Sequence, residues 1–237
     1  MSKLSSVKSA VLSLLRSVLG LDGTRHTRKV FDQIYAQGRW GKKGEDGFCS
    51  GGGSHAPAVV KPYVAAVSVF LSGLGGKQDV VDLGCGDFNV GRQIRPSCGR
   101  YIACDIVQPL IERNLKRFAD LNVEFRLMDL VADAWPPGDV VVIRQVLQHL
   151  SNRQVLKVVP KIANFRYAII TEHLPAQPGF KPNNDKVTGE FIRIRQQPAS
   201  GVVLHEAPFA LQVMAQQTLC TVPADGGAVV TTLYRLR

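Results

Sequence analysis

The pattern of apolar runs and polar breaks between residues 78 and 171 predicts an α/β fold. Short segments rich in Val, Ile and Tyr each end at a polar or glycine-containing stretch, and between them apolar residues recur at helical spacing. Strands that alternate with helices in this way form an open, mostly parallel sheet. The five predicted strands are 78–84, Tyr101–Asp105, Val123–Leu127, Asp139–Ile143 and Tyr167–Thr171.

Two helices of this pattern have recognisable starts. Ser54 is a suitable N-cap for a helix with Pro57 in its first turn and apolar positions that continue to Leu74. Ser151 and Gln154 form a capping box for a second helix. Pro160 is expected to kink that helix, because proline cannot donate the backbone hydrogen bond.

The last third of the chain has a different pattern. Residues 174–205 are rich in Pro, Asn, Gly and Arg without a clear period, so we expect a functional or disordered loop. Residues 209–221 and 228–236 then predict two strands, and Pro223–Gly227 predicts the hairpin turn between them.

The N-terminal residues 1–55 are predicted to be a basic extension ahead of a domain at 56–237. Residues 4–19 place apolar side chains on one face of a helix with basic ones elsewhere. Residues 1–44 hold nine Lys or Arg and two Asp, a net charge of +7 out of the +10 of the whole chain. An anionic membrane surface contacted by residues 1–22 is one expected partner, docking of this helix on the domain is the alternative, and nucleic acid is not excluded.

Residues 31–54 are predicted to cover a ligand cleft. Three glycines at 51–53 exclude a helix or an interior strand, and a plain linker would carry fewer aromatic residues than Tyr35, Trp40 and Phe48. The sequence therefore favours a glycine-rich lid in this stretch.

The stretch Val80–Asp87 carries the clearest chemical signal. A β-branched run ends in Gly84-Cys85-Gly86 and a helical pattern follows, which is the form of a first βα unit with a ligand at its turn. Asn89 stands where a dinucleotide fingerprint has its third glycine, and the acids Asp82 and Asp87 suit a cationic amine better than a pyrophosphate.

Two further acids follow the next two strands. Asp105 comes 19 residues after Gly86, the spacing of a carboxylate that accepts both hydroxyls of a ribose, and Asp129 follows the third strand. Capping of the following helices is the alternative role for both side chains.

Together these motifs resemble the class I S-adenosylmethionine-dependent methyltransferases, over residues 56–237. The resemblance implies a Rossmann-like fold with a mostly parallel seven-stranded sheet and a C-terminal β-hairpin. It also implies S-adenosylmethionine as the cofactor. The cofactor-binding residues it implies are Asp82, Gly84 and Gly86 at the methionine end, Asp105 at the ribose, and Asp129 with Leu130 at the adenine.

The residues before the core also resemble the equivalent segment of bacterial methyltransferases that occur beside sugar-modifying enzymes. Ile34-Tyr35, Trp40-Gly41 and Ser50–Ser54 carry this weaker likeness. Together with the core motif it favours an enzyme that methylates the oxygen of a saccharide, a glycolipid or another small molecule. The alternatives are an RNA methyltransferase and a non-catalytic partner protein that binds S-adenosylmethionine.

Three side chains near the strand ends are the catalytic candidates. His149 is the first choice for a base, because histidine titrates near neutrality, and His173 is the second. Arg144 could clamp a phosphate or carboxylate of the acceptor. Methyltransferases that modify amino groups often carry Asn or Asp followed by Pro-Pro and Tyr or Phe after the fourth strand. This chain reads Ile143-Arg144-Gln145-Val146 there, which disfavours methylation of bases or glutamine.

The remaining composition bears on metal binding and location. No cluster of histidines and carboxylates in the sequence indicates a metal site. Five scattered cysteines without a C-x-x-C pair favour reduced thiols. With no apolar run of membrane-spanning length, we expect a cytoplasmic protein, either free or peripheral at a membrane.

Overall fold

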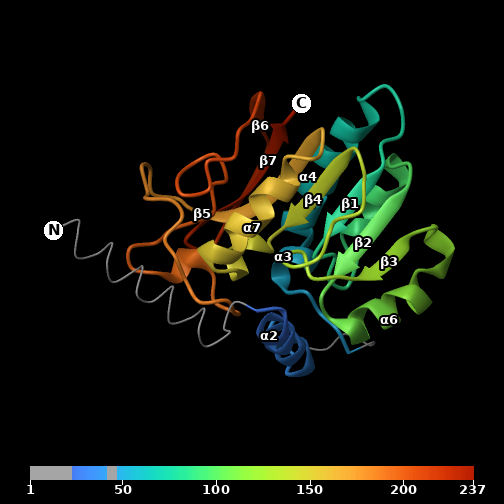
Figure 1. The fold of residues 1–237 in the computed structure, drawn as a ribbon, viewed down its shortest axis with the longest axis horizontal. Helices are drawn as coiled ribbons and strands as arrows, with labels where there is room; N and C mark the ends of the chain where they lie inside the picture. The colour runs from blue at the N-terminus through green and yellow to red at the C-terminus, as the bar shows by residue number, and fades with distance from the viewer. Residues whose placement is uncertain (1–22, 42–46) are drawn as a thin grey trace.

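The computed structural model describes residues 23–41 and 47–237, and these form a seven-stranded sheet with helices on both faces (Figure 1). The strand order is β3-β2-β1-β4-β5-β7-β6. Strands β1 to β5 pair in parallel, whereas β7 runs antiparallel to both β5 and β6. The strands are β1 Val80–Leu83, β2 Tyr101–Asp105, β3 Glu124–Leu127, β4 Val140–Arg144, β5 Tyr167–Pro175, β6 Ala215–Ala224 and β7 Gly227–Arg235. The predicted fold class is therefore confirmed.

The sheet separates two hydrophobic cores, because neighbouring residues of a strand point to opposite faces. Val81 and Leu83 of β1 belong to one core, in which α7 and α2 pack, and Val80 belongs to the other, in which α4 packs. Both faces are covered, so β1 is buried along its whole length. The α-helices are α2 Thr24–Ala36, α3 Gly52–His55, α4 Pro57–Ser72, α5 Gly91–Ile94, α6 Gln108–Arg117 and α7 Asn152–Ile162.

Helix α2 was not predicted, and it occupies the first part of the stretch expected to be a lid. Its apolar residues Phe31, Ile34 and Tyr35 are all buried in the core on the α7 face. The helical spacing of these three residues was the missed signal. Helix α2 is thus a packed element rather than a flexible cover.

The glycine run contains one turn of helix, α3, which corrects the expectation that it could not be helical. Ser54 lies inside this turn and does not cap α4. The N-cap of α4 is Ala56, without a side-chain hydrogen bond, while Pro57 stands in the first turn as expected. Proline there replaces an N–H that would lack a helical partner, so the helix can start without a polar cap.

The capping box of α7 is confirmed. Ser151 accepts a hydrogen bond from the backbone N–H of Gln154, and the Gln154 side chain accepts one from the backbone N–H of Ser151. Pro160 lies inside α7, two residues before its last residue. The C-terminal hairpin is also present, with a tighter turn than predicted at Asp225-Gly226 and a first strand that begins only at Ala215.

Residues 176–214, the long segment between β5 and β6, are held by side-chain hydrogen bonds rather than by a sheet or long helices. Asn183 is buried and donates to the carbonyls of Val203 and Ala207, each at 2.9 Å. Its own side-chain oxygen accepts from the N–H of Val203 at 2.8 Å. Polar side chains in this segment therefore serve as its internal supports, which explains the absence of an apolar period in the sequence.

The predicted amphipathic helix at 4–19 lies outside the described residues. Within residues 23–41 and 47–237, the structure contains no helix that is both long and apolar enough to cross a bilayer.

Candidate functional site

A cavity of about 550 Å³ lies at the carboxyl ends of the parallel strands. Ligands of open α/β sheets bind at this edge because the loops there converge. Three parts of the chain line the cavity: α2 with the residues up to Ser54, the loops after β1 to β4, and residues 190–195 of the long segment. The site is thus built by contacts between distant parts of the sequence.

The glycine loop at one end of the cavity is fixed by backbone hydrogen bonds. The N–H groups of Gly84 and Cys85 both donate to the carbonyl of Cys104 on β2. Gly86 donates its N–H to Asp105 Oδ2 at 3.0 Å and accepts from Asn114 Nδ2 at 2.7 Å. Its φ of +56° and its close approach to Ser50 leave no room for a Cβ, which gives the physical reason for glycine there.

Asp105 and Asp129 both line the cavity with buried carboxyl groups. Asp105 Oδ1 accepts from the N–H of Val107 at 3.0 Å, and Asp129 Oδ1 accepts from the N–H of Val131 at 2.8 Å. Both acids therefore support the turns that follow their strands. Neither caps a helix, which was the alternative role, because α6 begins after Val107 without a side-chain cap and no described helix lies between β3 and β4. Since a carboxylate offers about four lone pairs, these bonds leave acceptor positions for a ligand. Burial raises the pKa of Asp105 to about 6, despite backbone hydrogen bonds that lower it.

Asp82 lies beneath the loop and does not line this cavity. Its Oδ2 accepts a hydrogen bond from the Tyr101 hydroxyl at 2.9 Å. Burial raises the pKa of Asp82 to about 7, while the bond from Tyr101 lowers it. Asp82 would therefore act on the methionine end of the cofactor indirectly, by supporting the glycine loop that lines the cavity.

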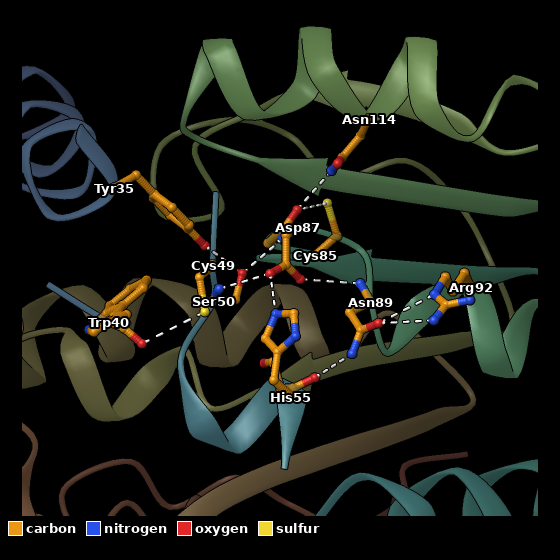
Figure 2. A network of polar contacts seen from close by, with 12 residues as sticks. Tyr35, Trp40, Cys49, Ser50, His55, Cys85, Asp87, Asn89, Arg92 and Asn114 are labelled. Carbon is orange, nitrogen blue, oxygen red and sulfur yellow. Dashed lines mark hydrogen bonds and ion pairs between the residues drawn. The ribbon is translucent and has the colours of Figure 1, made fainter. Parts of the chain in front are cut away.

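Residues 49–55, which we call the cover segment, are hydrogen-bonded directly to the glycine loop (Figure 2). The Ser50 N–H donates to Asp87 Oδ2 at 2.8 Å, and the Asp87 N–H donates to Ser50 Oγ at 2.9 Å. Tyr35 of α2 adds a bond between its hydroxyl and Ser50 Oγ at 2.9 Å. His55 Nε2 lies 2.5 Å from Asp87 Oδ2. The Asp87 carboxylate is thus used by the cover segment, which corrects the expectation that it would face a cationic amine.

The structure also brings together a group of potential metal ligands that the sequence did not indicate. One side-chain ligand atom each of Cys49, His55 and Asp87 lies within 4.8 Å of the others. Asp87 Oδ2 already accepts from His55 and from the backbone of Ser50. The arrangement is therefore that of a hydrogen-bonded pair with a nearby thiol.

Arg144 lines the cavity, but its donors bind the cover segment. Its Nη2 donates to the Gly53 carbonyl at 2.5 Å and its Nη1 to Ser54 Oγ at 3.4 Å. The guanidinium lies over the Tyr63 ring, 4.8 Å from the centroid. These contacts favour a role in holding residues 53 and 54, whereas the predicted clamp on an acceptor anion would compete with them.

His149 lies in the cavity wall as the sequence predicted. Its Nδ1 lies 3.1 Å from the carbonyl of Gly189, which can only accept, so Nδ1 carries the proton. Its Nε2 keeps its lone pair and lies 3.5 Å from Nε2 of Gln148. The imidazole packs between Trp40, at 5.0 Å between ring centroids, and the edge of Phe31 at 6.3 Å. Burial, and secondarily the charge of Lys186, lowers the pKa of His149 to about 4. The ring is therefore neutral at physiological pH.

His173 does not line the cavity. It lies on β5 opposite Val229 of β7, and its backbone N–H donates to the Gln148 side chain at 3.1 Å. Burial lowers the pKa of His173, although Asp225 opposes this shift. The geometry gives no support to His173 as the second choice for a base.

Sequence reasoning missed the contribution of the long segment to the cavity. Glu190, Phe191 and Arg195 line it, and Gln148 joins His149 in its wall. Gln145 also lines it, with an unusual φ of +55° for a residue that is not glycine. No period or short motif marked these residues, because hydrogen bonds to residues distant in the sequence place them. The one available signal was the presence of a long polar segment inside a compact domain.

The fold and the site define an open α/β protein with a cavity lined by two buried acids beyond neighbouring strand ends. Residues 81–165 match the model of the family described as "Methyltransferase domain". This match bears out the predicted resemblance to class I methyltransferases and the predicted enzyme class. S-adenosylmethionine, the predicted cofactor, is the methyl donor of this class.

Solved structures share the fold at low sequence identity. NodS, an N-methyltransferase from Bradyrhizobium japonicum WM9 solved with S-adenosyl-L-homocysteine, is 14% identical with a TM-score of 0.56, covering 76% of this chain and 87% of NodS. DhpI, solved with the same ligand (SAH), is 15% identical with a TM-score of 0.54, covering 90% and 97%. Phosphoethanolamine N-methyltransferase 1 of Haemonchus contortus is 16% identical with a TM-score of 0.58, covering 92% and 50%. No curated protein matches the chain.

Proposed function

We propose that this protein transfers the methyl group of S-adenosylmethionine to the oxygen of a saccharide, a glycolipid or another small molecule. The observation that carries the proposal is the composition of the cavity of about 550 Å³. It combines a glycine loop and two buried acids, at Asp105 and Asp129, with a neutral histidine that lines the same space. A donor and a small acceptor would therefore be enclosed together.

The residues that line the cavity after β2 and β3 fit the nucleoside part of the cofactor. Asp105 offers free carboxylate positions for ribose hydroxyls, and Asp129 lies next to Leu130 in the wall. Ile106 and Met128 add apolar surface that suits the faces of an adenine. When bound, the cofactor would supply a methyl group on a positively charged sulfur with a good leaving group.

The protein's own contribution would be to orient the acceptor and to exclude water. Methyl transfer is an in-line displacement, so an acceptor atom has to be held about 3 Å from the methyl carbon in the correct direction. His149 could orient a hydroxyl through its Nε2 lone pair and receive the proton as the new bond forms. Trp40 and the cover segment would close the space around this group.

Oxygen is favoured over nitrogen by this chain's own residues. The loop after β4 reads Arg144-Gln145-Val146 and lacks the Pro-Pro sequence of many amino-group methyltransferases. NodS and the Haemonchus contortus enzyme are named N-methyltransferases, but identities of 14% and 16% show the fold alone.

The acceptor class is tested by supplying labelled substrate. The purified chain is incubated with S-adenosylmethionine labelled in the methyl group and with separate fractions of cell glycans, lipids and RNA. Label in glycan or lipid, located on an oxygen atom by mass spectrometry of the isolated product, is the expected result. Label only in RNA would replace the proposal with an RNA methyltransferase, and no transfer to any fraction would favour a non-catalytic protein.

The cofactor assignment is tested by Asp105→Ala. Loss of a carboxylate that accepts ribose hydroxyls should weaken binding of S-adenosylhomocysteine by at least about tenfold, since a charged hydrogen bond contributes roughly 1.5–3 kcal/mol. Calorimetry measures this, with Asp120→Ala as the matched control because Asp120 is exposed. Equal affinity of the Asp105 variant and the wild type would overturn the assignment.

We further propose that residues 1–22 hold the enzyme at an anionic membrane surface. The net charge of +7 over residues 1–44 and the apolar face predicted at 4–19 support this. A glycolipid acceptor would then be presented at the same surface.

A further inference from the structure

Residues 189–195, which we call the mouth segment, present three side chains to the cavity from a fixed support. Glu190, Phe191 and Arg195 line the cavity, while Arg193 between them is only 1% exposed. A fully buried arginine is retained only where its donors are satisfied. The mouth segment is therefore anchored rather than laid loosely on the surface.

The anchor reaches the loop that carries His149. Arg193 Nη1 donates to the carbonyls of Leu147 and Gln148 at 3.1 and 3.2 Å, and its Nη2 donates to the carbonyl of Leu150 at 2.8 Å. At the other end, the N–H of Gly189 donates to the carbonyl of His149 at 3.0 Å, and the imidazole bonds back to Gly189. The backbone of the mouth segment is thus hydrogen-bonded to the loop that carries His149, which keeps Phe191 and Arg195 on the same side of the cavity as that histidine.

The charged side chains that line the cavity differ in whether they have a partner. Glu190 pairs with Arg39, with 3.3 Å between Oε2 and Nη1, and Arg39 Nε also donates to Gln37 at 2.7 Å. Arg144, deeper in the cavity, is occupied by the Gly53 carbonyl. The Arg195 guanidinium makes no hydrogen bond or ion pair with any residue that the structure describes, so it is the lining arginine with its side-chain donors available.

We propose that the methyl acceptor carries a phosphate or carboxylate group, which Arg195 binds at the mouth of the cavity, beside a ring or acyl group that lies against Phe191. This inference rests on the proposed function and adds the chemical class of the acceptor. A guanidinium binds either anion through two parallel N–H bonds. Phe191 is 72% exposed and lines the same mouth, so it offers an apolar surface next to that charge.

The opposite choice, a cationic acceptor held by Glu190, is disfavoured by the same contacts. The Glu190 carboxylate already has a cationic partner, so an amine would have to displace Arg39. With Glu190 neutralised in this way, the remaining charge at the mouth is that of Arg195. An anion meets a free donor there, whereas a cation meets repulsion.

Binding of small probes tests the proposal without knowledge of the natural acceptor. Phenyl phosphate, benzoate and benzyl alcohol share a ring and differ in the group that would meet Arg195. Each is titrated by calorimetry into the chain with and without S-adenosylhomocysteine. At least one of the two anions should bind about tenfold more tightly than the neutral alcohol, and the stronger of them identifies phosphate or carboxylate as the preferred group.

Substitutions assign the preference to a residue. Arg195→Gln should abolish the difference between anion and alcohol, and Arg195→Lys should retain part of it because the charge remains. Arg235→Gln is the matched control, since Arg235 is exposed and lies opposite Tyr167 at the start of β5, at the far end of that strand from the cavity. All three variants should bind S-adenosylhomocysteine as the wild type does.

Two results would overturn the inference: alcohol binding equal to that of both anions, or anion binding that persists in Arg195→Gln. Failure of every probe to bind would also overturn it. Loss of S-adenosylhomocysteine binding by the wild type would instead contradict the proposed function, so the two failures are distinguishable.

Discussion

His149 lies in the cavity wall after β4, and burial changes the pKa of its imidazole. The sequence puts a histidine five residues after β4, where its ordinary pKa near neutrality suits a base. In the folded protein the ring lies between Phe31 and Trp40, and desolvation lowers the pKa to about 4. In the role that we propose, the neutral imidazole orients the acceptor hydroxyl through Nε2 and takes its proton as the methyl moves.

This role predicts the behaviour of two variants at His149. His149→Ala and His149→Gln should each lower kcat by about 10²–10⁴-fold, the usual contribution of a general base, while affinity for S-adenosylhomocysteine is unchanged. Glutamine keeps hydrogen-bonding capacity and volume but cannot take a proton at neutral pH. Turnover within a few-fold of wild type in both variants, measured with the true acceptor, would contradict the role.

The pH profile gives an independent measurement of the same residue. Because the pKa of His149 is lowered to about 4, its Nε2 stays available as the pH falls through 6.5, and protonation removes it only near pH 4. In the wild type, kcat should therefore fall with an apparent pKa near 4 as the pH is lowered. This fall should be absent from the pH profile of His149→Gln. A limb near 6.5 that depends on His149 would show that the ring is charged more easily than its burial implies.

At the scale of elements, the cover segment is hydrogen-bonded to the residues after β1 and to the end of β4. Ser50 exchanges two hydrogen bonds with Asp87, and Arg144, the last residue of β4, donates to the carbonyl of Gly53. Asn89 adds a bond from its side chain to the carbonyl of Ser54 at 2.7 Å. We expect opening of these bonds to assist release of a ligand that lies against this segment.

The cover segment therefore predicts a slow step in ligand release. Ser50→Ala removes the oxygen that accepts from Asp87 and bonds to Tyr35, and should speed dissociation of S-adenosylhomocysteine by about tenfold. Stopped-flow dilution measures this rate. Ser72→Ala, at the exposed end of α4, is the matched control and should release the ligand as the wild type does. Identical rates for both variants would argue against a covering role.

At the scale of the whole molecule, the charge is concentrated at the N-terminus. Residues 1–44 carry a net +7 of the total +10, which attracts an anionic surface by about 1 kcal/mol per nearby basic residue. The domain itself has the cavity and its lining in residues 27–195. The basic stretch and the cavity lining thus overlap in α2 and at Arg39, so removal of residues 1–22 is the change that keeps every described lining residue in place.

Liposome flotation tests whether residues 1–22 bind such a surface. The full-length chain should float with vesicles that contain anionic lipid, less so as salt is raised, because salt screens exposed charges. A chain lacking residues 1–22 should remain at the bottom and keep its affinity for S-adenosylhomocysteine. Equal flotation of the two chains, or none by either, would favour docking of the helix on the domain.

The sequence by itself determined the sheet, the glycine loop and the acids beyond the strands. These features are local: β-branched runs predict buried strands, and in a parallel sheet their carboxyl ends share one edge, so Asp105 and Asp129 line the same cavity as Gly86. The capping box of α7 was readable for the same reason, since both partners lie within four residues.

Only the tertiary structure decided which side chains close the site. Arg193 reaches carbonyls 43 to 46 residues away, Ser50 meets Asp87 across 37 residues, and Arg144 is turned from a substrate clamp into a support for Gly53 across 91. Such contacts follow no period in the sequence. They form because buried polar groups must find partners wherever the fold brings them, and the same burial sets the pKa of His149.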